Sequence, residues 1–536
     1  MSKIVSAAEV AASIDSGQSI GSMGVIGWVV PDTLLKALGD RYRACGAPRD
    51  LTFYFPVAAG DAMSIRGMDH VAQPGLMKRI VSGSYINPVH PETGERPAIM
   101  RMIQNNEVEA YSWPIGASMH WLREVARKSP GYLTKIGLGT YADPDQGGGK
   151  FTPRCEADLI RKIDFEGEPY LFYPSWPLDC VFIRASSSDE FGNLSFEDEP
   201  LVSAGIALAL AAKASGGRVI AQARRIVPRN ARRATEVKLP GIFVDAVVHT
   251  PDMVMGTDTP HDVAYLHPSA NQVVPDIPFG PDKVIARRAA REVRKRELSI
   301  FGFGAAADVP LILAEQGLID PQTGSDDYWF TTEHGSYGGV VMSGWQFSAN
   351  IYPQALIDGL QQFDVIDGGL CQFAALAFAE YDQTGRVNVS KFGKANPGAG
   401  GFTDIATNAQ RLVFTGTFTT GGLDIAYVGG RMHVVREGKV RKFVTNAQSV
   451  TYSVAEGVQK GQSVLIVTER AVFEVEQEGL VLVEIAPGVD LERDVLALMD
   501  FPPARILDPL PLMDAALFDR VVNQKSVSSE SSAMTV

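Results

Sequence analysis

The sequence predicts an α/β protein made of two related open domains, and two observations carry this prediction. Short apolar runs such as "LTFYF" and "SVLIVT" alternate with longer helical patterns such as "PDTLLKALGDRYRA". That alternation is typical of α/β folds whose sheets are largely parallel. The chain has 536 residues, which is too long for one hydrophobic core, so we expect two or more domains.

Two pairs of similar segments predict that the domains are related. The stretch "QSIGSMGVIGWVVPDTLLKAL" has the pattern of a strand, a glycine turn, Pro31 and a helix, and "LSIFGFGAAADVPLILAEQG" repeats that order with Pro310. Later in each half, residues 186–196 and 379–392 both predict a strand, an Asp-x-x-Gly turn and a second strand. The intervals between the paired segments differ, so we expect insertions in the N-terminal half.

We place the N-terminal domain at residues 1–275 and the C-terminal domain at residues 298–521. Residues 276–297 form the predicted linker, which includes the basic helix "VIARRAAREVRKRE". We interpret its cations as a solvated helix face in preference to a phosphate site. Residues 522–536 have little apolar surface to bury and are expected to form a disordered tail.

Composition and charge exclude several classes of protein. The net charge of -13 argues against a nucleic-acid binder, because phosphate affinity needs a positive surface. The 4 cysteines lie far apart without a Cys-x-x-Cys pair, so neither a disulfide framework nor a zinc site is expected. The first residues lack the pattern of a secretory signal, and no apolar run reaches the roughly 18–20 residues of a membrane span. We therefore expect a cytoplasmic protein with no membrane partner.

Familiar nucleotide, hydrolase and metal motifs are incomplete or missing. The segment "GFGAAAD" (302–308) suits anion binding at the start of a helix, but it lacks the last glycine of GxGxxG. The chain contains no Walker A motif and no GxSxG elbow. His261 and His267 share a loop without the spacing of a helical metal pair, so no metal site is expected.

One carboxylate, Glu333, stands between a buried-strand pattern and a glycine-rich turn in "DDYWFTTEHGSYGG". It has two interpretations. The carboxylate could accept N–H groups of its own turn and be structural. Alternatively, it could attack an acyl carbonyl and form a mixed anhydride that exchanges with a thiolate. The second chemistry needs closely approaching N–H donors, and glycine-rich loops at 302–304, 335–339 and 395–405 could supply them.

His334 directly follows Glu333 and is a tempting base. Adjacent residues on a strand point to opposite faces, however, so we do not expect His334 to share the site.

Longer segments resemble the family I coenzyme A transferases, in particular the single-chain propionate/acetate type with fused α and β domains. The resemblance reaches about residue 520, and its anchors include "GSMGVIGWVVPDTLLKAL", "EPYLFYPSWPLDCVFIRASSSDEFGNLS", "TTEHGSYGG", "GRVNVSKFGKANPGAGGFTDI" and "VFTGTFTTGGLDI". It implies two open α/β domains of the NagB/RpiA/CoA transferase-like type, assembled as a homodimer or homotetramer.

The resemblance implies that Glu333 is the catalytic nucleophile of an acyl-CoA:carboxylate CoA-transferase. The enzyme would follow a ping-pong mechanism through a glutamyl-CoA thioester. Its partners would be acyl-CoA and carboxylic acid substrates, with no metal and no cofactor beyond coenzyme A as substrate. Two alternatives stay open: an acyl-CoA hydrolase that uses the same intermediate, and a non-catalytic acyl-CoA-binding protein.

The resemblance also assigns the other site residues. Gly400 or Gly401 would donate a backbone N–H to an oxyanion, and Val309 a second one. The coenzyme A chain would run past five residues of the C-terminal domain, namely Asn388, Ser390, Lys391, Gly302 and Gly304.

The acyl pocket is where the chain departs from the family pattern. The family usually has Pro-Gln-Gly where this chain has Pro114-Ile115-Gly116, so Ile115 predicts a less polar pocket. Trp113 would shape the same pocket, and Tyr337 would narrow it or hydrogen-bond the substrate. Substrate choice therefore stays open.

Overall fold

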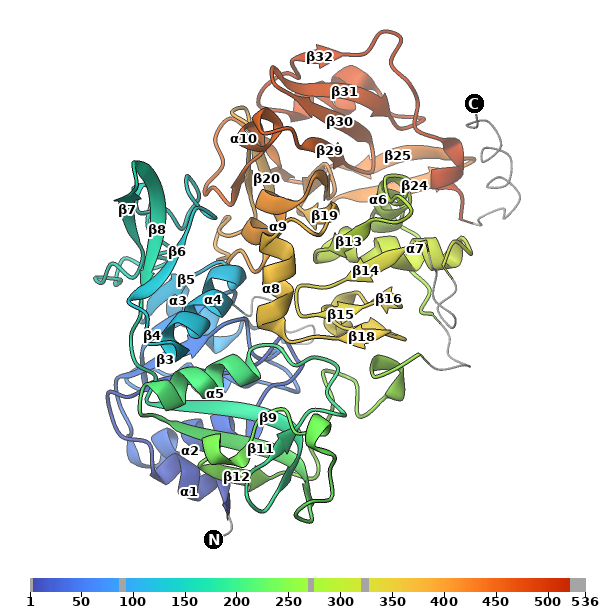
Figure 1. The fold of residues 1–536 in the computed structure, drawn as a ribbon. Helices are drawn as coiled ribbons and strands as arrows, with labels where there is room; N and C mark the ends of the chain where they lie inside the picture. Colours follow the sequence, from blue (N-terminus) through green and yellow to red (C-terminus); the bar gives the residue numbers. More distant parts are fainter. Residues whose placement is uncertain (1–2, 86–92, 269–273, 320–326, 521–536) are drawn as a thin grey trace.

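The structure is a computed structural model that describes residues 3–85, 93–268, 274–319 and 327–520. The predicted tail, 522–536, lies outside the described residues. Figure 1 shows the N-terminal half of the chain, blue to green, beside the C-terminal half, yellow to red. Each half contributes one large sheet, and helices α8 (Gly359–Asp367) and α9 (Phe402–Asn408) of the C-terminal half lie near the N-terminal helix α4 (Ile115–Ala126).

The first sheet has nine strands in the order β1-β12-β11-β9-β2-β3-β4-β5, with β10 paired to β9. All its pairings are parallel except that of β10 with β9. Continuous apolar runs such as "LTFYF" form its strands, because neighbouring elements pack on both faces of such a sheet. The strands are β1 (Ile4–Val5), β2 (Ser19–Ser22), β3 (Leu51–Phe55), β4 (Met77–Ser82), β5 (Glu109–Ser112), β9 (Cys180–Asp189), β10 (Leu194–Ser195), β11 (Arg218–Val227) and β12 (Ala246–His249).

The second sheet has ten strands in the order β18-β15-β14-β13-β19-β22-β29-β30-β31-β32. Its central strands β14, β13, β19, β22 and β29 are parallel. The strands are β13 (Leu298–Phe301), β14 (Trp329–Thr331), β15 (Ser336–Tyr337), β18 (Ala355–Leu356), β19 (Phe373–Ala377), β22 (Arg411–Thr415), β29 (Ser463–Val467), β30 (Ala471–Glu476), β31 (Gly479–Ile485) and β32 (Arg505–Ile506).

The two sheets share a parallel core with the same strand order. In the first sheet this core is β12-β11-β9-β2-β3, and in the second it is β29-β22-β19-β13-β14. The similar segments found in the sequence begin at equivalent strands, β2 and β13. The Asp-x-x-Gly turns also agree, because Asp189 and Asp382 each accept two N–H groups across a hairpin turn. The prediction of two related α/β domains is confirmed.

The longer N-terminal interval contains a small antiparallel sheet of order β6-β8-β7, visible beside β5 and α4 in Figure 1. Its strands are β6 (Gly131–Thr134), β7 (Arg161–Phe165) and β8 (Glu168–Pro174). The other helices of both halves are α1 (Ala7–Ala12), α2 (Asp32–Cys45), α3 (Ala98–Gln104), α5 (Gly205–Ala214), α6 (Pro281–Ala290), α7 (Val309–Glu315), α10 (Val454–Gln459) and α11 (Leu491–Asp494).

The cations of the predicted basic helix fall into two groups. Those that follow α6, at residues 291 and 294–296, are exposed, as expected for a solvated face. Within α6, Lys283 and Arg287 are buried and both pair with Glu315 of α7. Arg288 is also buried and forms a bidentate pair with Glu484 of β31. For the cations within α6 the expectation was wrong, because their acidic partners lie far along the chain and a charge run alone does not reveal them. The domain limits drawn at this helix stay a prediction.

We predict that Glu315→Gln destabilises the protein, because it leaves two buried cations without their shared counter-charge. Breaking a buried pair in this way costs roughly 3–5 kcal/mol, so the thermal midpoint should fall clearly. Asp40→Asn is the control, since Asp40 pairs with exposed Lys36 on α2 and such pairs contribute about 0–1 kcal/mol. Equal midpoints for the two variants would contradict the prediction.

Candidate active site

Glu333 lies in the tight turn that joins β14 to β15, directly beyond the end of a central parallel strand. The turn depends on glycine, because Gly335 has a φ of 88° and an added Cβ would lie 2.4 Å from the Ile357 carbonyl oxygen. The Glu333 side chain keeps 16% of its surface exposed. The carboxylate thus lies beyond the carboxyl end of a central strand, and part of the side chain remains accessible to a ligand.

The N–H of Gly401 donates to Glu333 Oε2 at 3.0 Å. Gly401 begins helix α9 and lies 68 residues further along the chain, so the donor does not come from the glutamate's own turn. An added Cβ on Gly401 would stand 2.2 Å from Oε2. Any side chain at this position would force the carboxylate to move.

The backbone of the neighbouring residue, Gly400, is clamped by two hydrogen bonds to the N-terminal domain. Its N–H donates to the Gly83 carbonyl oxygen at 3.1 Å, and its carbonyl accepts the N–H of Ile115 at 3.1 Å. Ile115 is fully buried at the first turn of α4. The structure therefore brings Gly400, Gly401 and Ile115, three residues named from the sequence, together beside Glu333.

Asp404 joins the two domains one turn into α9. Its Oδ2 accepts the N–H of Gly116 at 3.2 Å, and a Cβ on Gly116 would lie 2.2 Å from Oδ1. Burial, reinforced by the negative charges of Asp367 and Glu333, raises the pKa of Asp404 well above its usual range. This shift favours the neutral form of the carboxyl group, which lessens its repulsion with Glu333.

Further pairs fix α4 against α8 in the same region. His120 faces Asp367 at 3.0 Å, and Arg123 pairs with Asp364 at 2.7 Å. Phe363 of α8 is fully buried between Gly116 and Gly401. It lies 3.0 Å from a Cβ built on Gly116 and 3.4 Å from one built on Gly401. The site is thus formed by both halves of the chain.

His334 lies closer to the carboxylate than we expected. Its Nε2 is 3.4 Å from Glu333 Oε1, and its side chain is fully buried. The rule that neighbouring side chains point to opposite faces holds within a strand. Here both residues stand in the turn after the strand, where the rule does not apply.

Trp113 and Tyr337, two residues predicted for the acyl pocket, both make contacts within the protein. Trp113 is fully buried and packs edge-on against Tyr173 with ring centroids 5.0 Å apart. Tyr337 is partly buried, and its hydroxyl donates to Gln362 Oε1 at 2.6 Å. Burial raises the pKa of Tyr337 to about 12, so the hydroxyl stays protonated.

The second predicted oxyanion donor, Val309, is the first residue of α7. Its N–H donates to the Ala306 carbonyl within the preceding 3-10 turn, and its side chain is fully buried. Gly302 precedes that turn, and Gly304 is its first residue. Gly304 has a φ of 85°, and the N–H of Gly302 donates to the Ala375 carbonyl at 2.8 Å.

The other three residues predicted to bind coenzyme A lie at the end of β21 (Arg386–Asn388) and in the compact turn that follows it. Asn388 is fully buried, and its amide donates to Glu380 at 2.6 Å and to the Lys391 carbonyl at 2.7 Å. Ser390 is fully buried too, and its N–H donates to Asn388 Oδ1 at 3.1 Å. Lys391 is partly exposed. Asn388 and Ser390 thus stabilise the turn, and Lys391 has exposed surface that could contact a ligand.

Sequence reasoning missed Asp404 and Phe363. Asp404 lies within the quoted segment "PGAGGFTDI", three residues after Gly401, and helical spacing could have placed it beside the same loop. Phe363 carries no such signal, because its place between Gly116 and Gly401 depends on how α8 packs.

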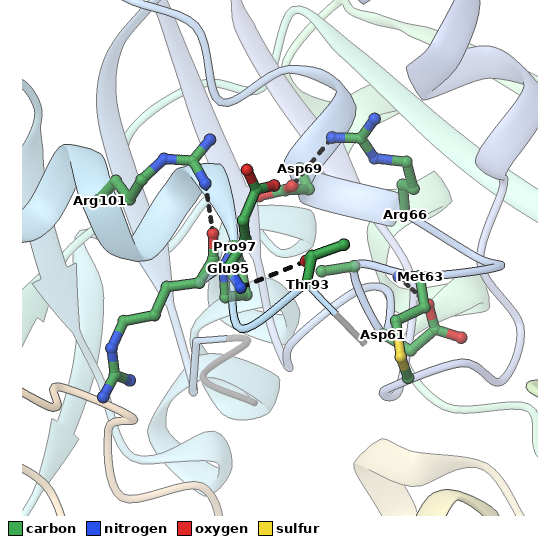
Figure 2. A pocket seen from close by; sticks show the side chains of 10 residues that line it. Asp61, Met63, Arg66, Asp69, Thr93, Glu95, Pro97 and Arg101 are labelled. Atoms are coloured by element: carbon green, nitrogen blue, oxygen red, sulfur yellow. Dashed lines mark hydrogen bonds and ion pairs between the residues drawn. The ribbon is translucent and has the colours of Figure 1, made fainter. Parts of the chain in front are cut away.

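A separate hollow of about 270 Å³ lies in the N-terminal domain, and Figure 2 shows its acidic and basic lining. Its two aspartates already have partners. Asp61 accepts the N–H of Ile65 and the hydroxyl of Thr257, and Asp69 accepts the N–H of Ile99 and an Arg66 guanidinium N–H. We therefore assign this hollow to the scaffold.

Within the described residues, no cluster of three or more His, Cys, Asp or Glu side chains could hold a metal ion. In the same part of the chain, no helix has the length and apolar character needed to cross a membrane.

Comparison with known proteins agrees with this geometry. A family profile described as Coenzyme A transferase matches residues 4–250. The chain is 35% identical to the acetate CoA-transferase YdiF of Escherichia coli strain K12, over 96% of this chain and 95% of that protein. It is 36% identical to the caffeate CoA-transferase of Acetobacterium woodii, over 97% of this chain and 98% of that protein.

Among solved structures, an acyl-CoA transferase from E. coli O157:H7 (YdiF), in a thioester complex with CoA, superposes with a TM-score of 0.88. The two are 34% identical, and the match covers 97% of each chain. The chain therefore belongs to the coenzyme A transferase family, and its activity is that of an acyl-CoA transferase.

We predict that Gly401→Ala lowers turnover by about 10²-fold, the usual cost of losing one preorganised donor at a reacting oxygen. The added methyl group would stand where the Glu333 carboxylate now lies. Steady-state kinetics would measure the effect. Gly280→Ala is the control, because Gly280 has open space around it. A Gly401→Ala enzyme within twofold of the parent would contradict this prediction.

Proposed function

We propose that this enzyme moves coenzyme A between carboxylic acids through a glutamyl-CoA thioester on Glu333. One observation carries the proposal: a partly exposed carboxylate beyond a central strand accepts the N–H of a glycine whose missing side chain leaves room for that carboxylate. The relation to CoA-transferases supports the same reading of the site.

The proposed reaction begins when a Glu333 oxygen attacks the acyl carbon of the donor. The carbon–sulfur bond breaks, coenzyme A leaves as its thiolate, and a glutamyl–acyl anhydride forms. The thiolate then attacks Glu333 Cδ, and the acid leaves as a carboxylate, taking the bridging oxygen with it. An acceptor carboxylate reverses both steps. The thioester conserves the energy of the original bond, so the exchange needs no other energy source.

The Gly401 N–H supports this chemistry because it already faces a glutamate oxygen. Negative charge develops on that oxygen when the thiolate adds to Cδ, and a fixed donor needs no reorganisation at that moment. Of the two glycines proposed for this role we favour Gly401, because the N–H of Gly400 is bound to Gly83. A donor role for Val309 would require its N–H to leave the Ala306 carbonyl.

Ile115 is our proposed determinant of acyl selectivity. It is apolar, contacts the Gly400 peptide and stands where the family usually has Gln. An apolar wall cannot hydrogen-bond a polar acyl group, so we propose that the enzyme prefers acids with an apolar chain or ring. Coenzyme A binding at residues 388–391, a homo-oligomeric assembly and a cytoplasmic location stay predictions.

The proposed intermediate can be tested by its mass. The enzyme is incubated with acetyl-CoA or propionyl-CoA without acceptor. The mass of the intact protein is then measured by mass spectrometry before and after treatment with borohydride. We expect a coenzyme A adduct in the parent and in Glu476→Gln, whose carboxylate pairs with Arg505 on the exposed surface. Glu333→Ala should form no adduct and lose turnover by several orders of magnitude, comparable with other lost nucleophiles.

An adduct on Glu333→Ala, or near-parental turnover by that variant, would refute the nucleophile assignment. Release of coenzyme A without any acceptor acid would favour the hydrolase. Acyl-CoA binding that is unaffected by Glu333→Gln, with no adduct on either protein, would favour the non-catalytic binding protein.

The role of Ile115 can be tested with a panel of acyl-CoA donors. We predict that Ile115→Gln shifts the ratio of kcat/KM values toward smaller or more polar acyl groups, because it restores a hydrogen-bonding side chain. The size expected for one such contact is about 10-fold or more. Ile115→Leu is the matched control and should keep the parental order. An unchanged profile in Ile115→Gln would remove Ile115 from substrate choice.

A further inference from the structure

His334 is a buried polar side chain that the mechanism above does not use. Its side chain has 0% exposure. Neither Nδ1 nor Nε2 makes a hydrogen bond within the described part of the chain. Buried polar groups normally have a partner, because leaving one without a hydrogen bond costs folding free energy. A ring kept in this state beside the nucleophile calls for a functional explanation.

The position of the ring relative to the carboxylate supplies one. The two oxygens of Glu333 face different groups: Oε2 accepts the Gly401 N–H at 3.0 Å, and Oε1 lies 3.4 Å from His334 Nε2. The separation of Nε2 and Oε1 is only slightly longer than a hydrogen bond. Contacts of this kind in a free enzyme often tighten when the reacting complex forms.

The two oxygens also have different fates in the reaction. One stays on Cδ as the carbonyl oxygen of the anhydride and the thioester. The other bonds to the acyl carbon, becomes the bridging oxygen and leaves with the released acid. Gly401 serves the first role at Oε2, so Oε1, which faces His334, is left for the second.

We propose that His334 is a catalytic hydrogen-bond donor to Glu333 Oε1. The Nε2–H orients Oε1 for attack and stabilises the negative charge that this oxygen carries when the Oε1–Cδ bond breaks and the acid leaves. The proton stays on Nε2 throughout, because a carboxylate nucleophile has no proton to give up. His334 therefore acts as a donor and not as the base that its place beside Glu333 first suggests. This inference rests on the proposed function.

Single-turnover kinetics of the full chain can test the role. The probe is propionyl-CoA without acceptor, with adduct formation followed by intact mass, and acetate is then added to follow adduct loss. His334→Leu keeps an apolar side chain in the buried site but has no donor. His334→Gln restores an N–H at about the same reach, because its amide Nε2 replaces the imidazole Nε2.

We expect His334→Leu to slow adduct formation and adduct loss by about 10- to 100-fold, within the range for donors and acids in active sites. KM for propionyl-CoA should change little, and His334→Gln should recover most of the rate. His70→Gln is the control. His70 is another buried histidine near a carboxylate, 3.1 Å from Asp32 in the N-terminal domain, and this variant should react at the parental rate.

Three outcomes would overturn the inference. One is parental adduct kinetics in His334→Leu. Another is an equal rate loss in His334→Leu and His334→Gln when both melt like the parent, since a donor role requires rescue. The third is a parent enzyme that forms no adduct at all, which would refute the proposed function and this inference together. If His334→Leu does not fold, His334→Met replaces it as the variant without a donor.

Discussion

The site depends on the backbone of Gly400, which the N-terminal domain holds on both sides. The Gly83 carbonyl binds the peptide group before Gly400 and the Ile115 N–H binds the one after it, which also contains the Gly401 N–H, and this fixes the direction of that N–H. The Gly401 N–H meets the Glu333 carboxylate, and a side chain on Gly401 would force the carboxylate to move. A donor held by the fold need not reorganise when charge develops on its partner. The packing of α4 against α8 and α9 therefore fixes the geometry of the hydrogen bond from Gly401 to Glu333.

The two halves of the chain use the same strand order for different purposes. Each sheet contains the five-stranded parallel core, but the carboxylate follows β14 in the second sheet, whereas Pro56 follows the equivalent strand β3 in the first. The N-terminal half instead provides the first turn of α4 and the Gly83 carbonyl. One domain thus carries the nucleophile, and the other fixes and surrounds it.

Much of this was predictable from sequence, and the failures have physical causes. Apolar runs, proline positions and Asp-x-x-Gly turns are local signals, and they predicted the α/β class, the related halves and the place of Glu333 at a strand end. Three features escaped these signals, two because they depend on contacts across space and one because it depends on a turn. The cations of α6 are buried because Glu315 and Glu484 reach them. His334 faces Glu333 because a turn breaks the alternation of the strand. Asp404 binds the N–H of Gly116 from the other domain.

The clamp on Gly400 has a consequence for how the site persists at low protein concentration. Its two hydrogen bonds join residues more than 280 positions apart in the numbering, yet they belong to one polypeptide. Docking of the halves is therefore an intramolecular event, whose equilibrium does not depend on the protein concentration. If the same halves were two separate chains, they would have to associate. Dilution would then dissociate them and disrupt the site. In this protein the covalent connection keeps Gly83 and Ile115 bound to Gly400, beside the nucleophile and its donor, however dilute the solution becomes.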